Sequence, residues 1–150
     1  MRPDPRLWLG FVLLIAPGTG YGAAALSRRP LLAECKPGEA RVFPRVRVQA
    51  FDGRVLNGAS EGKAPLVGLQ IELRSLREEG SYYVLSDAEG RFSFAEVPQG
   101  GYVLTTCLDG WDALEVEVEL RSTAKAVSCE LVVSPSEAAG KREVRWTKRE

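Results

Sequence analysis

The chain of 150 residues carries 20 basic and 20 acidic side chains, so its formal net charge is zero. This length allows one domain with a full core and leaves no room for two ordinary ones. The charge balance argues against nucleic-acid binding, and an apolar content of 45% argues against wholesale disorder. The sequence contains no histidine, which excludes a Ser-His-Asp triad and argues against an enzyme, because histidine is the most versatile acid and base near neutral pH.

Residues 1–25 are predicted to be a secretory signal peptide. Arg2 and Arg6 form a basic start, residues 7–16 (LWLGFVLLIA) an apolar run, and small residues follow at 22–25. The run is short for a membrane span, which takes about 20 residues. We therefore expect a periplasmic or extracellular protein with no membrane span left after cleavage. Two alternatives stay open, namely a retained N-terminal membrane anchor and a lipoprotein lipidated on Cys35.

After an irregular lead-in at residues 26–40, the chain shows seven short segments in which apolar and polar side chains alternate, as in half-buried strands. They are residues 42–49, 66–73, 82–85, 91–94, 102–108, 114–120 and 126–133. Turn signals separate them, among them Asp52-Gly53 and the loop at 57–65. The pattern predicts an all-β fold, a seven-stranded antiparallel β-sandwich over residues 41–134. A polar tail at residues 135–150 follows, with a short strand or helix expected near 144–147.

Three motifs between residues 65 and 111 carry a resemblance to a known family. They are PLVGLQIEL (65–73), SDAEGRFSF (86–94) and VPQGGYVL (97–104), the last followed by DGW (109–111). The characteristic residues are Asp87, Gly90, Phe92, Phe94, Pro98, Gly100, Tyr102, Gly110 and Trp111. In this order they resemble the carboxypeptidase regulatory-like domain over roughly residues 42–133. The resemblance implies a Greek-key, transthyretin-like (prealbumin-like) sandwich related to carbohydrate-binding-like folds.

The three cysteines are candidates for one disulfide and one spare thiol in an oxidising compartment. Strand alternation turns Cys107 outward and Cys129 inward, while Cys35 lies in the lead-in. We expect a Cys35–Cys107 disulfide that pins the lead-in to the sandwich, with Cys107–Cys129 as the alternative. A catalytic thiol is not expected, because no histidine is present to activate it.

Two groups of acidic residues have both a functional and a structural interpretation. Asp87 and Glu89 could belong to a Ca²⁺ loop, but the EF-hand ligand spacing is missing and a capped turn is expected. A row of glutamates could hydrolyse glycosidic bonds, as paired carboxylates do in some enzymes. We expect this row to be the solvated face of its strand. If the two strands are neighbours, Arg45 and Arg47 would pair with this row, which consists of Glu115, Glu117 and Glu119.

The sequence favours an exported, non-catalytic module that binds a protein or glycan, or acts as a structural spacer, in the cell envelope. The expected partner is an envelope or extracellular protein, or a glycan, and not nucleic acid. Trp111, with Tyr82 or Tyr83, could stack on a sugar, although Trp111 could instead cap the core. No catalytic residue, cofactor or metal site is predicted. The alternatives are a carbohydrate-binding domain and a small hydrolase on a transthyretin-like fold, against which the missing histidines argue.

Overall fold

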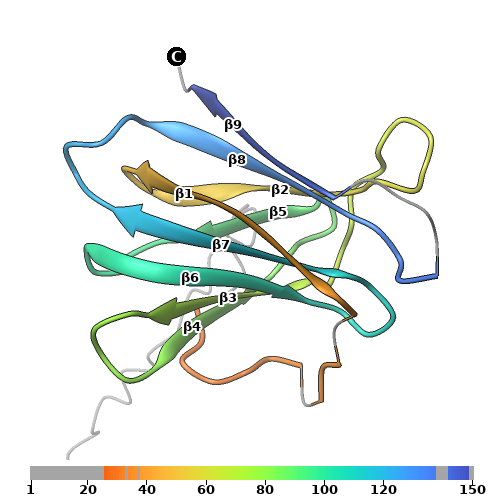
Figure 1. Ribbon diagram of the computed structural model, residues 1–150, viewed down its shortest axis with the longest axis horizontal. Helices are drawn as coiled ribbons and strands as arrows, with labels where there is room; N and C mark the ends of the chain where they lie inside the picture. Colours follow the sequence, from red (N-terminus) through yellow and green to blue (C-terminus); the bar gives the residue numbers. More distant parts are fainter. Residues whose placement is uncertain (1–25, 33, 37, 138–141, 149–150) are drawn as a thin grey trace, which may run out of the picture.

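The described part of the chain contains nine β-strands and no helix, which confirms the predicted all-β class (Figure 1). The computed structural model describes residues 26–32, 34–36, 38–137 and 142–148, so the predicted signal peptide lies outside it. No helix that could cross a membrane is found among these residues. The strands are β1 (Ala40–Val48), β2 (Phe51–Asn57), β3 (Gln70–Ser75), β4 (Ser81–Leu85), β5 (Arg91–Phe94), β6 (Gly100–Cys107), β7 (Ala113–Leu120), β8 (Val127–Val133) and β9 (Glu143–Lys148).

The strands form the two layers of a sandwich. One sheet has five strands in the order β1-β7-β6-β3-β4, and the other has four in the order β5-β2-β8-β9. The pairs β1–β7 and β2–β8 are parallel, and the other neighbouring pairs are antiparallel. The prediction of a seven-stranded antiparallel arrangement is therefore wrong in two respects, because the described residues form nine strands and both sheets are mixed.

Strand β2 was missed because it contains the turn signal Asp52-Gly53. The chain instead bends at Gln49 and Ala50, and Gly53 lies inside the strand, opposite Cys129 of β8. A Cβ atom on Gly53 would overlap the carbonyl oxygen of Cys129. Glycine is therefore needed here for the close approach of two backbones and not for a turn.

Strand β9 is the second addition, and it confirms that the tail holds a short strand near residues 144–147. It pairs antiparallel with β8, with Val144 opposite Leu131. The ring of Trp146 lies 5.8 Å from that of Phe51, centroid to centroid. Because these tail residues pack against the core, the four-stranded sheet extends well beyond residue 134.

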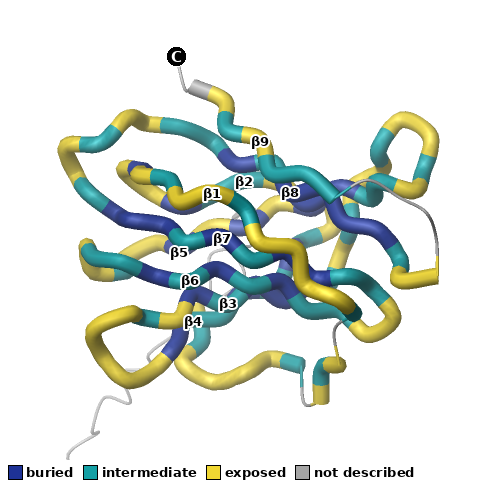
Figure 2. The backbone as a smooth tube through the Cα atoms, viewed as in Figure 1, coloured by how far each residue is buried: buried dark blue, intermediate teal, exposed yellow. Residues whose placement is uncertain are grey.

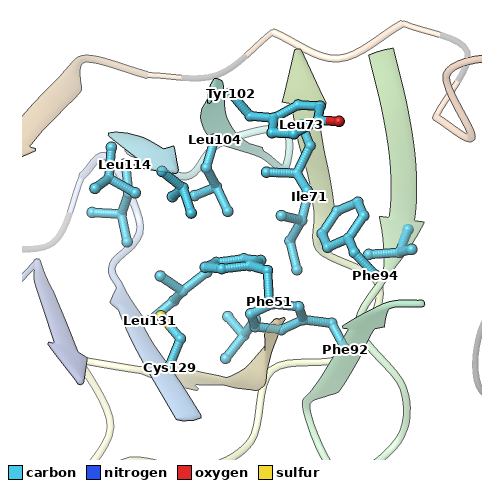
Figure 3. Packing of buried hydrophobic residues seen from close by; sticks show 14 of the residues in the cluster. Phe51, Ile71, Leu73, Phe92, Phe94, Tyr102, Leu104, Leu114, Cys129 and Leu131 are labelled. Carbon is cyan, nitrogen blue, oxygen red and sulfur yellow. The ribbon is translucent and has the colours of Figure 1, made fainter. Parts of the chain in front are cut away.

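The buried side chains lie between the two sheets, whereas β1 is largely exposed (Figure 2). Strand β1 is an edge strand in the described fold and contains Pro44, which lacks the N–H that an inner strand would need. In the core, the ring of Phe51 lies 5.4 Å from Phe92 and 5.9 Å from Phe94 (Figure 3). Such aromatic clusters contribute beyond the apolar area that they bury. The apolar residues that alternate along the strands at 91–94 and 114–120 are buried, as the pattern predicts.

The Asp87 segment forms a capped turn, as expected. The Oδ1 atom of Asp87 accepts hydrogen bonds from the backbone N–H groups of Glu89 (3.0 Å) and Arg91 (2.8 Å). Gly90 has φ 74°, a left-handed conformation that favours glycine. A Cβ atom on Gly90 would also lie 2.5 Å from the carbonyl oxygen of Val55. This turn therefore sets the approach of β5 to β2.

The remaining motif residues also have structural positions. Tyr102 is buried, and its hydroxyl donates to the carbonyl oxygen of Pro98 at 2.6 Å. Gly100 and Gly110 have φ angles of 151° and 80°. Trp111 packs against the core cluster and forms a β-bridge with Pro135. These positions account for the motif by packing and turn geometry.

Candidate functional site

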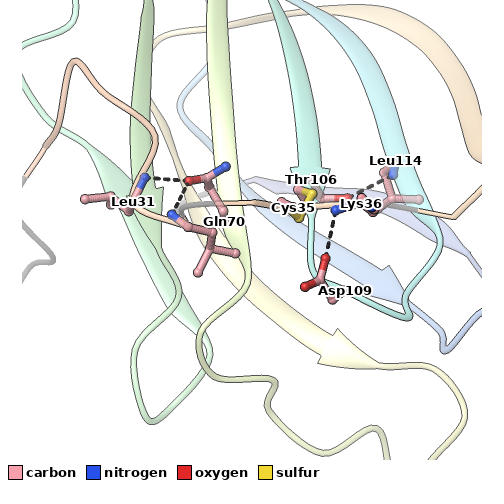
Figure 4. The surroundings of a disulfide bond; sticks show 9 residues. Leu31, Cys35, Lys36, Gln70, Thr106, Asp109 and Leu114 are labelled. Atoms are coloured by element: carbon pink, nitrogen blue, oxygen red, sulfur yellow. Dashed lines mark hydrogen bonds between the residues drawn. A yellow bond between two sulfur atoms is a disulfide. The ribbon is translucent and has the colours of Figure 1, made fainter.

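The residues that precede β1 lie along the five-stranded sheet and close part of its outer face. We call the described residues between 26 and 39 the N-terminal arm. Ser27 extends the edge of the sheet by two backbone hydrogen bonds with Tyr83 of β4, at 3.0 and 2.8 Å. Further along, the N–H groups of Leu31 and Leu32 both donate to the Oε1 atom of Gln70, at 2.7 and 3.0 Å (Figure 4). Gln70 faces outward from β3 but is buried, because the arm covers it.

A disulfide between Cys35 and Cys107 fixes the arm to the end of β6. Its Cα atoms are 6.1 Å apart, and the two residues are separated by 72 positions in the sequence. Next to it, the N–H of Lys36 donates to the Oδ1 atom of Asp109 at 2.7 Å (Figure 4). The N–H of Gly38 donates to the carbonyl oxygen of Trp111 at 2.8 Å. Covalent and polar contacts thus hold the arm from β4 to the start of β1.

The predicted Cys35–Cys107 pairing is confirmed, and the Cys107–Cys129 alternative is wrong. Cys129 points into the core, where only 2% of its surface is exposed. Burial raises the pKa of its thiol, so this group is inert as a nucleophile. Because the sulfur of Cys35 is bonded to Cys107, it is not free to carry a thioether-linked lipid, which disfavours the lipoprotein alternative.

The arm and the sheet border an open hollow of about 320 Å³, which we call the arm pocket. Its wall on the arm side is formed by Pro30, Leu32 and Cys35. The sheet contributes Gln70, Glu72, Tyr83, Thr105, Thr106 and Cys107. The pocket therefore has an apolar wall on one side, with a carboxylate, hydroxyl groups and an amide on the other. Its volume lies at the lower end of the range for ligand pockets, which combine apolar side chains with a small number of polar groups.

Glu72 provides the acidic group of the arm pocket. Its Oε1 atom accepts hydrogen bonds from the hydroxyls of Ser81, at 2.6 Å, and Tyr83, at 3.3 Å. The three side chains share the outer face because Glu72 of β3 lies opposite Tyr83 of β4, with Ser81 two residues away. Loss of hydration raises the pKa of Tyr83, and the negative charge of Glu72 raises it further. The hydroxyl of Tyr83 therefore keeps its proton and can donate to a ligand or to Glu72.

Two of the three glutamates in the row, Glu117 and Glu119, pair with arginines, as expected for neighbouring strands. β1 lies beside β7, with Arg47 opposite Glu119. The carboxylate of Glu119 forms ion pairs with Arg45 Nη2 at 2.8 Å, Arg47 Nε at 3.0 Å and Arg121 Nε at 2.7 Å. These arginines, with the hydrogen bond from Arg121 the strongest contribution, hold the pKa of Glu119 below its usual 4.5. The network ties edge strand β1 to the sheet, and the interpretation as a fully solvated face is wrong for Glu119, which is buried.

The three aromatic residues proposed for sugar stacking do not form one surface. Tyr82 lies opposite Leu73 and packs against the core, where its ring centroid is 6.3 Å from that of Tyr102. Trp111 packs at the opposite end of the arm, on the core cluster. Of the three, Tyr83 lines the arm pocket. Successive residues of a strand point to opposite faces, so Tyr82 and Tyr83 cannot act together.

Among the described residues, no cluster of three or more histidine, cysteine, aspartate or glutamate side chains has a metal-binding arrangement. Comparison with known proteins finds no matching family, no matching curated protein and no matching solved structure. The arm pocket is therefore the feature of the structure from which a function can be inferred. Sequence reasoning had not singled out Gln70, Glu72 or Thr105, because strand alternation assigns them simply to a polar outer face.

Proposed function

We propose that this chain is an exported, non-catalytic β-sandwich module of the cell envelope that binds a protein or a glycan, or acts as a structural spacer. We further propose that the sandwich is of the Greek-key, transthyretin-like type seen in carboxypeptidase regulatory-like domains. The ordered motif from Asp87 to Trp111 supports this assignment, since Gly90, Gly100 and Gly110 have positive φ angles and the aromatic residues pack in or against the core.

The disulfide-fixed arm is the observation that carries the proposal. Disulfides form and persist in oxidising compartments, which agrees with the predicted signal peptide. The same bond holds the arm over the outer face and forms one wall of the arm pocket. A preformed pocket lowers the entropy lost on binding, which favours a binding module over a plain spacer.

The lining of the arm pocket supports binding more than catalysis. Glu72 and Tyr83 share a hydrogen bond, but the chain has no histidine that could act beside them as a base near neutral pH. A small hydrolase on this fold is therefore the weaker alternative. A carbohydrate-binding domain is a second candidate, because the ring of Tyr83 and the hydroxyl of Thr105 offer the stacking and hydrogen bonding that sugars use.

The test is a glycan array together with a pull-down from cell-envelope extract, using the oxidised full-length protein purified from an oxidising compartment. A binding module retains a defined glycan or protein, and the Tyr83→Ala variant retains less of it because the pocket is altered. Tyr82→Phe is the matched control, since this neighbour faces the core. If the wild-type protein retains nothing in either assay, the spacer role replaces the binding role. Turnover of a bound glycan or peptide would contradict the non-catalytic assignment.

A further inference from the structure

The arm pocket carries a negative charge without a basic partner. Glu72 is the charged side chain among the described residues that line it. Across the sheet, Thr105 lies between Glu72 on one side and Glu115 on the other. Neighbouring strands are about 4.8 Å apart, so the backbones of the two glutamates are about 10 Å apart. Over the described ranges, neither of these glutamates forms an ion pair, whereas Glu117 and Glu119 on the same face do.

The basic side chains nearest along the chain do not line the arm pocket. Arg74 lies two residues further along β3 on the same face. On the arm, Arg29 precedes Pro30, and Lys36 follows Cys35. None of these three belongs to the lining, and Arg28 stacks on the ring of Tyr82. A cationic group that entered the pocket would therefore meet the Glu72 carboxylate directly. Such charge-assisted hydrogen bonds are stronger than those between neutral groups, and more so where water is partly excluded.

The rest of the lining fits an alkyl chain. Pro30, Leu32 and the disulfide form an apolar wall opposite Glu72, and the half-buried ring of Tyr83 adds an aromatic surface. A lysine side chain has this two-part character, since its methylene stem prefers apolar surroundings and its ammonium group prefers a carboxylate. An aromatic ring near the ammonium adds a cation–π attraction.

We propose that the arm pocket is a docking site for a lysine side chain presented by a partner protein, with the ammonium group on Glu72 and the methylene stem between the arm and Tyr83. This inference rests on the proposed binding function and names its partner chemistry. The arm is part of the site, so the Cys35–Cys107 disulfide keeps the pocket in its binding-competent form.

The test is a titration of the ¹⁵N-labelled, oxidised full-length protein with Nα-acetyl-lysine N-methylamide, followed by NMR. Amide shifts are expected at Leu31, Leu32 and Glu72, and the neutral norleucine analogue should produce weak shifts or none. Glu72→Gln keeps the shape of the side chain but removes its charge, and should weaken lysine binding by about fivefold to tenfold. Glu117→Gln is the matched control, because Glu117 lies on the same face outside the pocket and pairs with Arg45. Its affinity for the lysine probe should stay within about twofold of wild type.

Three results would overturn the inference: no shifts at the pocket with the lysine probe, equal binding of the norleucine analogue, or unchanged affinity of Glu72→Gln. Preferential binding of a neutral sugar at the same amides would make the pocket a glycan site instead. The pull-down separates this failure from that of the proposed function. Equal capture of an envelope protein by wild type and Glu72→Gln contradicts lysine docking in the pocket and leaves the binding module standing. Thermal melting of each variant verifies that it is folded.

Discussion

Removing the Cys35–Cys107 disulfide should destabilise the folded protein strongly. The double variant Cys35→Ser/Cys107→Ser deletes the bond without leaving an unpaired thiol on the surface. The native contacts of the arm, such as the hydrogen bonds from Leu31 and Leu32 to Gln70, remain possible in this variant. The main loss is therefore the covalent constraint on the unfolded chain.

The sequence separation gives the size of the effect. A cross-link between residues 72 positions apart removes conformational entropy from the unfolded chain worth about 4.4 kcal/mol at 25 °C in the loop-closure model. Measured values for native disulfides in small exported domains are about 2–5 kcal/mol. We therefore expect the free energy of unfolding of the double variant to be about 2–4 kcal/mol below that of the oxidised wild type.

Urea unfolding followed by tryptophan fluorescence measures this difference. Wild type under reducing conditions should match the double variant, because both lack the cross-link. Cys129→Ala is the control, since it keeps the disulfide and removes one buried sulfur atom, at a cost of about 1 kcal/mol. A loss below about 1 kcal/mol in the double variant would refute the reasoning, because the bond would then constrain neither the arm nor the unfolded chain.

Three further changes probe other parts of the fold. In chemical unfolding, Gly90→Ala should lower the free energy of unfolding by about 2 kcal/mol or more, and Gly62→Ala by about 1 kcal/mol. Both glycines have φ 74°, but of the two only Gly90 has a neighbour that an added Cβ atom would meet. Equal losses would contradict the clash with Val55. Glu119→Gln should be less stable than wild type at pH 7, because the pKa of Glu119 is lowered in the folded state. This extra stability of the wild type is fully present above the usual pKa of 4.5 and is lost as the pH falls through the lower folded value. A gap between the two melting curves that is the same at pH 7 and pH 3 would show that the arginine network does not act through charge. Gln70→Ala should raise the hydrogen-exchange rates of the Leu31 and Leu32 amides by about tenfold while the disulfide stays intact. The reason is that the side-chain oxygen of Gln70 accepts a hydrogen bond from each amide. Unchanged rates would mean that the disulfide alone orders the arm.

Most strands after residue 90 could be predicted well because apolar and polar residues alternate in them, whereas the strand expected at 66–73 begins only at Gln70. In β7, for example, Leu114, Val116 and Val118 face the core as the sequence indicates. The same alternation favoured the lead-in cysteine as the disulfide partner of the outward Cys107, with Cys129 left as the alternative that the structure rules out.

The features that were missed depend on contacts between distant segments. Gly53 is a turn residue by local chemistry, and its role in the β2–β8 pairing is visible only once Cys129 lies opposite it. A short strand or helix was expected near residues 144–147, but the packing of β9 on the core is evident only from the contact of Trp146 with Phe51. The arm pocket combines Leu32 with residues of three strands, a combination that strand alternation does not encode.

Counting free thiols gives the most direct test of an exported module with a covalently fixed arm. The protein is purified without reductant from its native compartment. The account predicts one free thiol, that of Cys129, which reacts only after denaturation because it is buried. Non-reducing peptide mapping should recover the peptides of Cys35 and Cys107 joined. Three free thiols in that protein would contradict both the fixed arm and the oxidising compartment.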